Sequence, residues 1–157
     1  MILLENVDRL LKSPVSQQGR DFGIILACLN DLRYTVEWRV VNAAEYGFPQ
    51  RRRRAFIVGR RDGPATSSRV NAMDWIAKEG DLSQALPVKW NDFGLTGEKF
   101  DIKGDIHFIG DHFGQGLGCS PFGLAGVCED RQVTTCPVPA DSARDSQYSS
   151  RRVTSRQ

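Results

Sequence analysis

The chain has 157 residues, of which 40% are hydrophobic and 25% charged, and its formal net charge is +2. That length suits one ordinary domain or part of a larger one, and the composition excludes a wholly disordered chain. The N-terminal stretch MILLENVDRLL carries no basic residue ahead of its apolar run, so it is typical neither of a secretory signal nor of a membrane span. We therefore expect a soluble, cytoplasmic protein with no membrane contact.

The cysteines do not follow a metal-binding or disulfide pattern. There are four of them, with no CxxC pair and no cluster of histidines to accompany them. We expect reduced thiols and no metal site. The four residues are Cys28, Cys119, Cys128 and Cys136.

Residues 1–4 have the apolar pattern of a short buried strand, which ends at Glu5 and Asn6. Ligands of parallel α/β sheets bind at the carboxyl ends of the strands, so these two polar residues occupy a place suited to chemistry. The alternative is that Glu5 caps a short helix over residues 7–11, where its negative charge would favour the first turn. Position alone favours this structural alternative.

A helix and two further strands are predicted next. Apolar residues at helical spacing indicate an amphipathic helix over residues 20–32, and alternating ones indicate a strand over residues 34–42. Strand, helix and strand in this order imply a right-handed parallel crossover. The next predicted strand, residues 54–59, follows so closely that it should pair antiparallel with its predecessor. These elements predict an α/β sheet.

Four consecutive arginines lead into the last of these strands. If residues 50–58 are extended, Arg52 and Arg54 share one face, and Arg51 and Arg53 share the other. Two guanidinium groups on one face can bind a planar acceptor or a phosphate. The alternative is a solvated basic patch, and the arginines taken alone favour it.

The order and spacing of these motifs resemble the DNA cytosine-5 methyltransferase family. Two motifs of that family are matched, ENV by residues 5–7 and Gln-x-Arg-x-Arg by residues 50–54 within NAAEYGFPQRRRR. The resemblance is strong over residues 1–61 and weaker over residues 120–133. It implies the C-terminal portion of a Rossmann-like methyltransferase sheet, with strand, helix, strand and an antiparallel strand, followed by an irregular region.

The resemblance also implies a chemistry and a set of residues. A cysteine thiolate attacks C6 of a cytosine flipped out of double-stranded DNA, and C5 then accepts a methyl group from S-adenosylmethionine. Glu5 would hold the N3 and N4 edge of the base, Arg54 would contact its O2 atom, and Arg52 would hold the active-site loop. These three are the implied catalytic residues. Asn6 and Gln50 are the implied substrate-binding residues.

Three features of the family have no match in this sequence: the Gly-rich cofactor loop, the Pro-Cys nucleophile motif, and a closing motif near the end of a complete member. None of the four cysteines follows a proline. We therefore predict a partial methyltransferase that is inactive alone and that a complementary chain could complete. Two alternatives remain open, a non-catalytic nucleic-acid-binding module that uses the arginine cluster of residues 51–54, and a pseudogene product without function.

The remaining segments give weaker signals. A short helix is predicted over residues 70–78, but most of the region up to residue 118 shows no clear periodicity. The final residues are rich in Ser, Arg and Gln, which predicts disorder. The expected segments are the C-terminal part of a methyltransferase catalytic domain over 1–61, a linker or irregular region over 62–119, the start of a target-recognition region over 120–140 and a disordered tail over 141–157.

Overall fold

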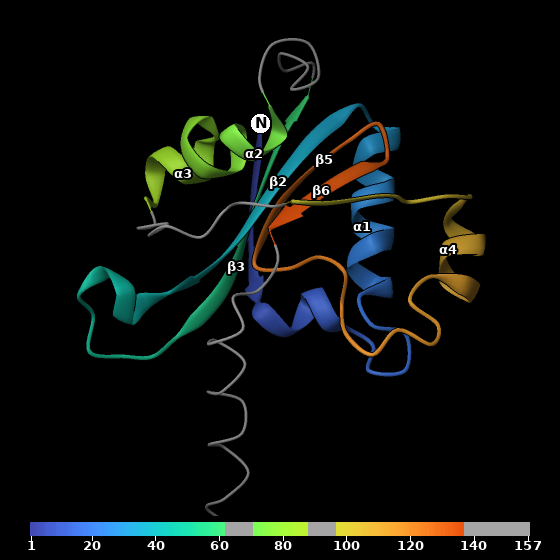
Figure 1. Cartoon of the computed structure of the whole chain (residues 1–157), viewed down its shortest axis with the longest axis horizontal. Helices are drawn as coiled ribbons and strands as arrows, with labels where there is room; N and C mark the ends of the chain where they lie inside the picture. Colours follow the sequence, from blue (N-terminus) through green and yellow to red (C-terminus); the bar gives the residue numbers. More distant parts are fainter. Residues whose placement is uncertain (62–70, 88–96, 137–157) are drawn as a thin grey trace, which may run out of the picture.

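The computed structural model describes residues 1–61, 71–87 and 97–136, and these build one six-stranded sheet (Figure 1). The strands are β1 (Ile2–Val7), β2 (Tyr34–Asn42), β3 (Arg53–Arg61), β4 (Glu98–Asp101), β5 (Ala125–Glu129) and β6 (Gln132–Cys136). Their order across the sheet is β1-β3-β2-β5-β6-β4, and every neighbouring pair is antiparallel.

Helical segments cover both faces of the sheet (Figure 1). One face carries α1 (Arg20–Asp31), against which α4 (Ile106–His112) packs, and the other carries α2 (Ala72–Asp74), the π-helical turn η4 (Trp75–Glu79) and α3 (Asp81–Ala85). Two short 3-10 helices, η1 (Asp8–Lys12) and η2 (Ala43–Tyr46), lie in the connections after β1 and β2. No helix in the described part of the chain is long and apolar enough to cross a bilayer.

The predicted α/β fold is confirmed, with one difference in how the strands are connected. The predicted helix and strand over residues 20–32 and 34–42 correspond to α1 and β2, and β3 is antiparallel to β2 as expected. β1 and β2 run in the same direction, but β3 lies between them and pairs with both. The crossover through α1 therefore joins strands that are parallel but not adjacent.

β1 is longer than its apolar pattern predicted. It extends to Val7, so Glu5 and Asn6 lie inside the strand, opposite Phe56 and Ala55 of β3. The physical reason is that pairing with β3 continues past the apolar residues. Backbone hydrogen bonding to a neighbour, rather than local hydropathy, sets where this strand ends.

The chain after β3 contains strands that its irregular pattern did not reveal. β5 pairs with β2, β6 pairs with β5, and β4 pairs with β6, so all three extend the same sheet. The helix predicted over residues 70–78 is represented by α2 and η4, which begin at Ala72. The predicted linker residues 62–70 and the predicted disordered tail, residues 141–157, lie outside the described residues.

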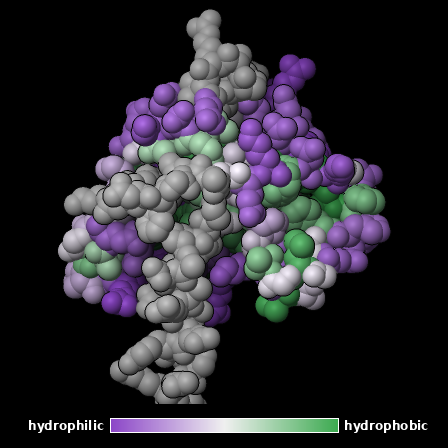
Figure 2. Space-filling model, viewed as in Figure 1, coloured by the Kyte–Doolittle hydropathy of each residue, from purple (hydrophilic) through white to green (hydrophobic). Residues whose placement is uncertain are grey.

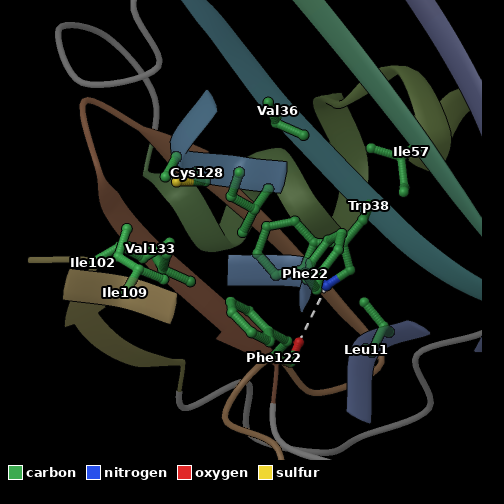
Figure 3. Packing of buried hydrophobic residues seen from close by; sticks show 12 residues of the cluster. Leu11, Phe22, Val36, Trp38, Ile57, Ile102, Ile109, Phe122, Cys128 and Val133 are labelled. Atoms are coloured by element: carbon green, nitrogen blue, oxygen red, sulfur yellow. Dashed lines mark hydrogen bonds between the residues drawn. The ribbon is translucent and has the colours of Figure 1, made fainter. Parts of the chain in front are cut away.

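The main core lies between the sheet and α1 (Figure 3). Three buried rings meet edge to face in it, with ring centroids 5.3 Å apart for Phe22 and Trp38 and 4.9 Å apart for Phe22 and Phe122. Nε1 of Trp38 donates a hydrogen bond of 3.1 Å to the carbonyl oxygen of Phe122, drawn dashed in Figure 3. A Cβ atom added at Gly126 would clash with the Trp38 ring, so a glycine is needed there. Trp38 thus connects β2, α1 and the segment before β5.

The opposite face of β2 carries two buried charged residues, Glu37 and Arg39. Oε1 of Glu37 accepts a hydrogen bond of 3.1 Å from the backbone N–H of Leu82. The guanidinium of Arg39 donates to the carbonyl oxygens of Ile76, Leu82 and Leu86, at 3.3 Å for Leu82 and 2.9 Å for Leu86. Burial raises the pKa of Glu37 and lowers that of Arg39, and each charge acts against the shift of the other. The two charges fasten the segment of residues 71–87 to the sheet.

Candidate functional site

Glu5 of β1 and Arg54 of β3 form an ion pair. Glu5 lies opposite Phe56 in the strand register, so Arg54, two residues earlier on β3, is its diagonal neighbour on the same face of the sheet. Nε of Arg54 lies 2.7 Å from Oε1 of Glu5. Half of the Glu5 side chain remains exposed, at 50%, whereas Arg54 is 28% exposed. The pair therefore presents a carboxylate and a guanidinium side by side at the surface.

The structure does not support the alternative in which Glu5 caps a helix. η1 begins at Asp8, its N-cap residue is Val7, and no side chain caps it. The acidic residue in its first turn is Asp8. The extension of β1 to Val7 moves the start of η1 away from Glu5, whose side chain contacts Arg54 instead.

The other predicted site residues are near in sequence but do not join this ion pair. β3 starts at Arg53, so Arg52 and Gln50 lie in the preceding loop with exposed side chains, and the backbone N–H of Arg52 donates to the Gln50 carbonyl at 3.0 Å. Asn6 is exposed, and its Oδ1 accepts from the backbone N–H of Val7 at 2.7 Å. Among the five predicted residues, the described side-chain contacts bring together Glu5 and Arg54.

A second ion pair was missed by reasoning from the sequence. Nε of Arg53 lies 3.3 Å from Oδ2 of Asp8. Arg53 points to the opposite face of β3 from Arg54, as the alternation predicts, and η1 places Asp8 on that face. An acidic residue directly after the first strand was the available signal, but only the register of β1 against β3 shows which arginine it contacts.

The loop between β2 and β3, residues 43–52, is held by its own hydrogen bonds. Oδ1 of Asn42 accepts from the N–H of Ala44 at 3.2 Å, and Gly47 takes a left-handed conformation with φ 84° at the end of η2. The hydroxyl of Tyr46 donates to the carbonyl oxygen of Leu86 at 3.1 Å. This loop carries Gln50, Arg51 and Arg52 in an ordered connection that is also bound to the segment of residues 71–87.

Two of the cysteines are poor nucleophiles. Burial raises the pKa of Cys128 to about 12 and that of Cys136 to about 11. Their thiols stay protonated near neutral pH, and the thiolate is the nucleophilic form. All four cysteines are free thiols. The described residues contain no group of three acidic, histidine or cysteine side chains that could hold a metal ion.

β1 is an edge strand within the described sheet. It pairs with β3 on one side, and its other side has no strand partner among the described residues. Several of its apolar side chains are exposed, with Leu3 at 64%, Leu4 at 43% and Val7 at 44%. Exposed apolar edges of this kind favour pairing with a further strand.

Glu5→Gln should change the free energy of unfolding by less than about 1 kcal/mol, because ion pairs with one partner this exposed contribute little to stability. Urea unfolding followed by circular dichroism measures the difference. The matched control is Asp8→Asn, which breaks the ion pair with Arg53 on the other face. A loss of several kcal/mol in Glu5→Gln would show that Glu5 is a structural residue.

Comparison with known proteins connects these residues to a family. Over 58 residues the chain is 71% identical to the Type II methyltransferase M.Sau3AI of Staphylococcus aureus, covering 37% of this chain and 14% of that protein. Over 63 residues it is 49% identical to the Type II methyltransferase M.SacI of Streptomyces achromogenes, which covers 40% of this chain and 15% of that protein. Over 57 residues it is 47% identical to the Type II methyltransferase M.NgoBI of Neisseria gonorrhoeae, which covers 36% of this chain and 17% of that protein. The chain thus spans less than a fifth of the length of these relatives. No solved structure matches it.

The family model described as C-5 cytosine-specific DNA methylase matches residues 1–113. This range holds the Glu5–Arg54 pair, the loop of residues 43–52 and the helical segments that cover the second face. It also continues through β4 and α4. Because the family model matches most of the chain's length, the chain belongs to the C-5 cytosine-specific DNA methylase family.

Proposed function

We propose that this chain supplies the base-orienting part of a DNA cytosine-5 methyltransferase, which transfers a methyl group from S-adenosylmethionine to C5 of a cytosine in DNA. The observation that carries the proposal is the Glu5–Arg54 pair, with its 2.7 Å contact and its half-exposed carboxylate, in a chain of this family. A cytoplasmic location is part of the proposal, since bacterial DNA lies there.

The chemistry of the pair suits a cytosine that has left the duplex. A carboxyl group can accept a hydrogen bond from the N4 amino group and, when protonated, can donate one to N3. Oε1 of Glu5 is held by Arg54, and Oε2 has no hydrogen-bond partner within the described residues. Arg54 fixes the carboxylate and, as a permanent cation, would stabilise negative charge that develops at O2 of the base.

The remaining predicted residues take supporting roles in this proposal. Arg52, exposed in the loop before β3, would contact the loop that carries the nucleophile in a complete enzyme. Gln50, exposed in the same loop, and Asn6, whose side chain accepts from the N–H of Val7 beside Glu5, would bind the substrate. The nucleophile itself would come from elsewhere, because none of the four cysteines follows a proline, and Cys128 and Cys136 are in addition buried as protonated thiols.

The described residues do not fit S-adenosylmethionine by themselves. That cofactor supplies the methyl group, and its adenosine and sulfonium parts need an open backbone cradle after a strand. β1 ends at Val7 and η1 begins at Asp8 with no loop between them, and Gly19, the first glycine of the chain, has its open side filled by the Phe122 ring. No step of the reaction is therefore assigned to cofactor binding by this chain.

The open edge of β1 supports a complementary partner. A chain carrying the cofactor loop and the nucleophile would add a strand along β1 and cover the exposed side chains of Leu3, Leu4 and Val7. This pairing would place its active-site loop next to Glu5. In this proposal the 157-residue chain alone transfers no methyl group.

A hybrid enzyme tests the proposal. The 58-residue stretch of M.Sau3AI that matches this chain is replaced by the corresponding stretch of this chain, and transfer of labelled methyl groups to DNA is measured. We expect an active hybrid that loses activity by about 100-fold or more with Glu5→Gln, since it removes a group that acts on the reacting base.

The control in the same hybrid is Glu45→Gln, which neutralises an exposed carboxylate of η2 and should leave methyl transfer unchanged. An inactive hybrid, or one in which Glu5→Gln has no effect, would contradict the proposal. A chain that binds DNA independently of Glu5 while the hybrid stays inactive would instead favour the non-catalytic binding module.

A further inference from the structure

Phe48 is a large apolar side chain at the surface of the loop between β2 and β3. It is 63% exposed, although most aromatic residues of the described chain are packed in the core or against it. In Figure 1 this loop lies at the lower left, away from the body of the sheet, and Figure 2 shows apolar and hydrophilic residues side by side at that end. A partner that covered the phenyl ring would remove apolar surface from water, which is favourable.

Backbone hydrogen bonds order the turn that carries this ring. The N–H of Phe48 donates to the carbonyl oxygen of Ala43 at 3.3 Å, and Gly47 before it is held in its left-handed turn. On the C-terminal side, the N–H of Ala43 donates to the carbonyl oxygen of Arg52 at 3.0 Å and closes the loop. Phe48 is therefore displayed by an ordered turn, and its contact with a partner costs little conformational entropy.

Positive charge next to Phe48 indicates the chemistry of the partner. Arg51 and Arg52 are exposed, and their side chains have no hydrogen-bond or ion-pair partner within the described residues. A guanidinium binds phosphate oxygens well, whereas an aromatic ring stacks on a nucleobase that is not covered by its neighbours. An aromatic ring three residues from an arginine, Arg51, that has no partner within the described residues matches the alternating bases and phosphates of a nucleic acid strand.

We infer that Phe48 stacks on an unstacked base of DNA while Arg51 contacts a flanking phosphate. This inference rests on the proposed function, because a base is unstacked where a methyltransferase extrudes its target. It adds a contact outside the Glu5–Arg54 pair. Phe48 positions the DNA strand and touches no reacting atom.

The test is DNA binding by the full chain, measured by fluorescence anisotropy on a duplex with one abasic site, which leaves the opposite base unpaired. Phe48→Ala should weaken binding by about 10-fold, a typical loss for one stacked base. Phe48→Trp should restore it, and Phe48→Leu, apolar but without an aromatic face, should not. The dependence of affinity on salt should be the same in all three variants.

Arg51→Ala is the matched control for the charged contact. It should reduce the slope of log affinity against log salt by about one, because it removes one phosphate contact.

If Arg51→Ala weakens binding but Phe48→Ala does not, the inference about Phe48 is wrong and the proposed DNA interaction stands. If Phe48→Leu binds as tightly as the unchanged chain, an apolar protein contact explains the exposed ring and stacking is excluded. Failure of the unchanged chain to bind this duplex would contradict both the inference and DNA binding by the chain alone, whereas the hybrid enzyme would still report on the Glu5–Arg54 pair.

Discussion

Arg39→Met should lower the free energy of unfolding by about 3–5 kcal/mol, the range found when one partner of a buried charge pair is removed. The variant leaves the buried carboxylate of Glu37 without its nearest positive charge and removes the donors to three carbonyl oxygens on the second face. Urea unfolding followed by circular dichroism measures the loss. The substitution would release the segment of residues 71–87 from β2.

The control is Arg60→Ala, which breaks the exposed ion pair with Asp81 on the same helical segment. Its cost should stay below about 1 kcal/mol because Arg60 is largely exposed. Similar losses in both variants would mean that burial of Arg39 does not matter.

The loss in Arg39→Met should depend on pH. Burial raises the pKa of Glu37 above its ordinary value of 4.5, and Arg39 acts against that shift, so removing Arg39 should raise this pKa further. An acid whose pKa is raised by folding destabilises the folded state as the pH rises from the unfolded pKa through the folded one. The deficit relative to the unchanged chain should therefore be smallest at acid pH, where Glu37 is protonated in both folded proteins, and should grow as the pH rises through their folded-state pKa values.

Trp38→Ala should lower the free energy of unfolding by about 3–5 kcal/mol, as expected for deleting a fully buried indole that the surrounding core cannot replace. Trp38 has no exposed surface, and it contacts the rings of both Phe22 and Phe122. The measurement is again the free energy of unfolding, with near-ultraviolet circular dichroism to report packing of the rings.

Trp38→Phe separates packing from the hydrogen bond. It keeps an aromatic ring but leaves the carbonyl oxygen of Phe122 without its 3.1 Å donor, so a smaller loss of about 1–3 kcal/mol is expected. If Trp38→Ala and Trp38→Phe lowered the free energy of unfolding by the same amount, the hydrogen bond rather than the ring would account for the stability that Trp38 provides.

The elements that were predicted correctly are those whose signal is local. Phe22 and Leu26 recur at helical spacing and are buried in α1, and Val36 and Trp38 alternate with Glu37 and Arg39 in β2. The short chain between β2 and β3 likewise limits them to an antiparallel pair. Periodicity and loop length are properties of a single segment, so they can be read without the rest of the fold.

The elements that were missed depend on contacts distant in sequence. β5 and β6 are short, and their pairing with β2 and with each other defines them as strands. The alternation in β2 predicts two faces, but it does not show that segment 71–87 buries Glu37 and Arg39.

The candidate site was likewise predictable only where its signal is local. The motifs that contain Glu5 and Arg54 are recognisable in the sequence, and the β1–β3 register brings the two side chains together. The contact of Asp8 with Arg53 follows from the same register, because Val7 lies opposite Arg54 and Asp8 is the next residue, and no local pattern predicts that register. The exposure of Phe48 likewise follows from the shape of the loop rather than from its sequence.

The carbonyl oxygen of Leu86 accepts hydrogen bonds from both Arg39 and Tyr46. One residue belongs to the buried face of β2, and the other to the loop that carries Phe48 and the exposed arginines. The free energy that holds the helical segments on the sheet is therefore linked to the free energy that holds this loop. Linkage of this kind is reciprocal: a ligand that stabilises the loop also stabilises the covering segment on the sheet, and a substitution that loosens this segment weakens binding of the ligand.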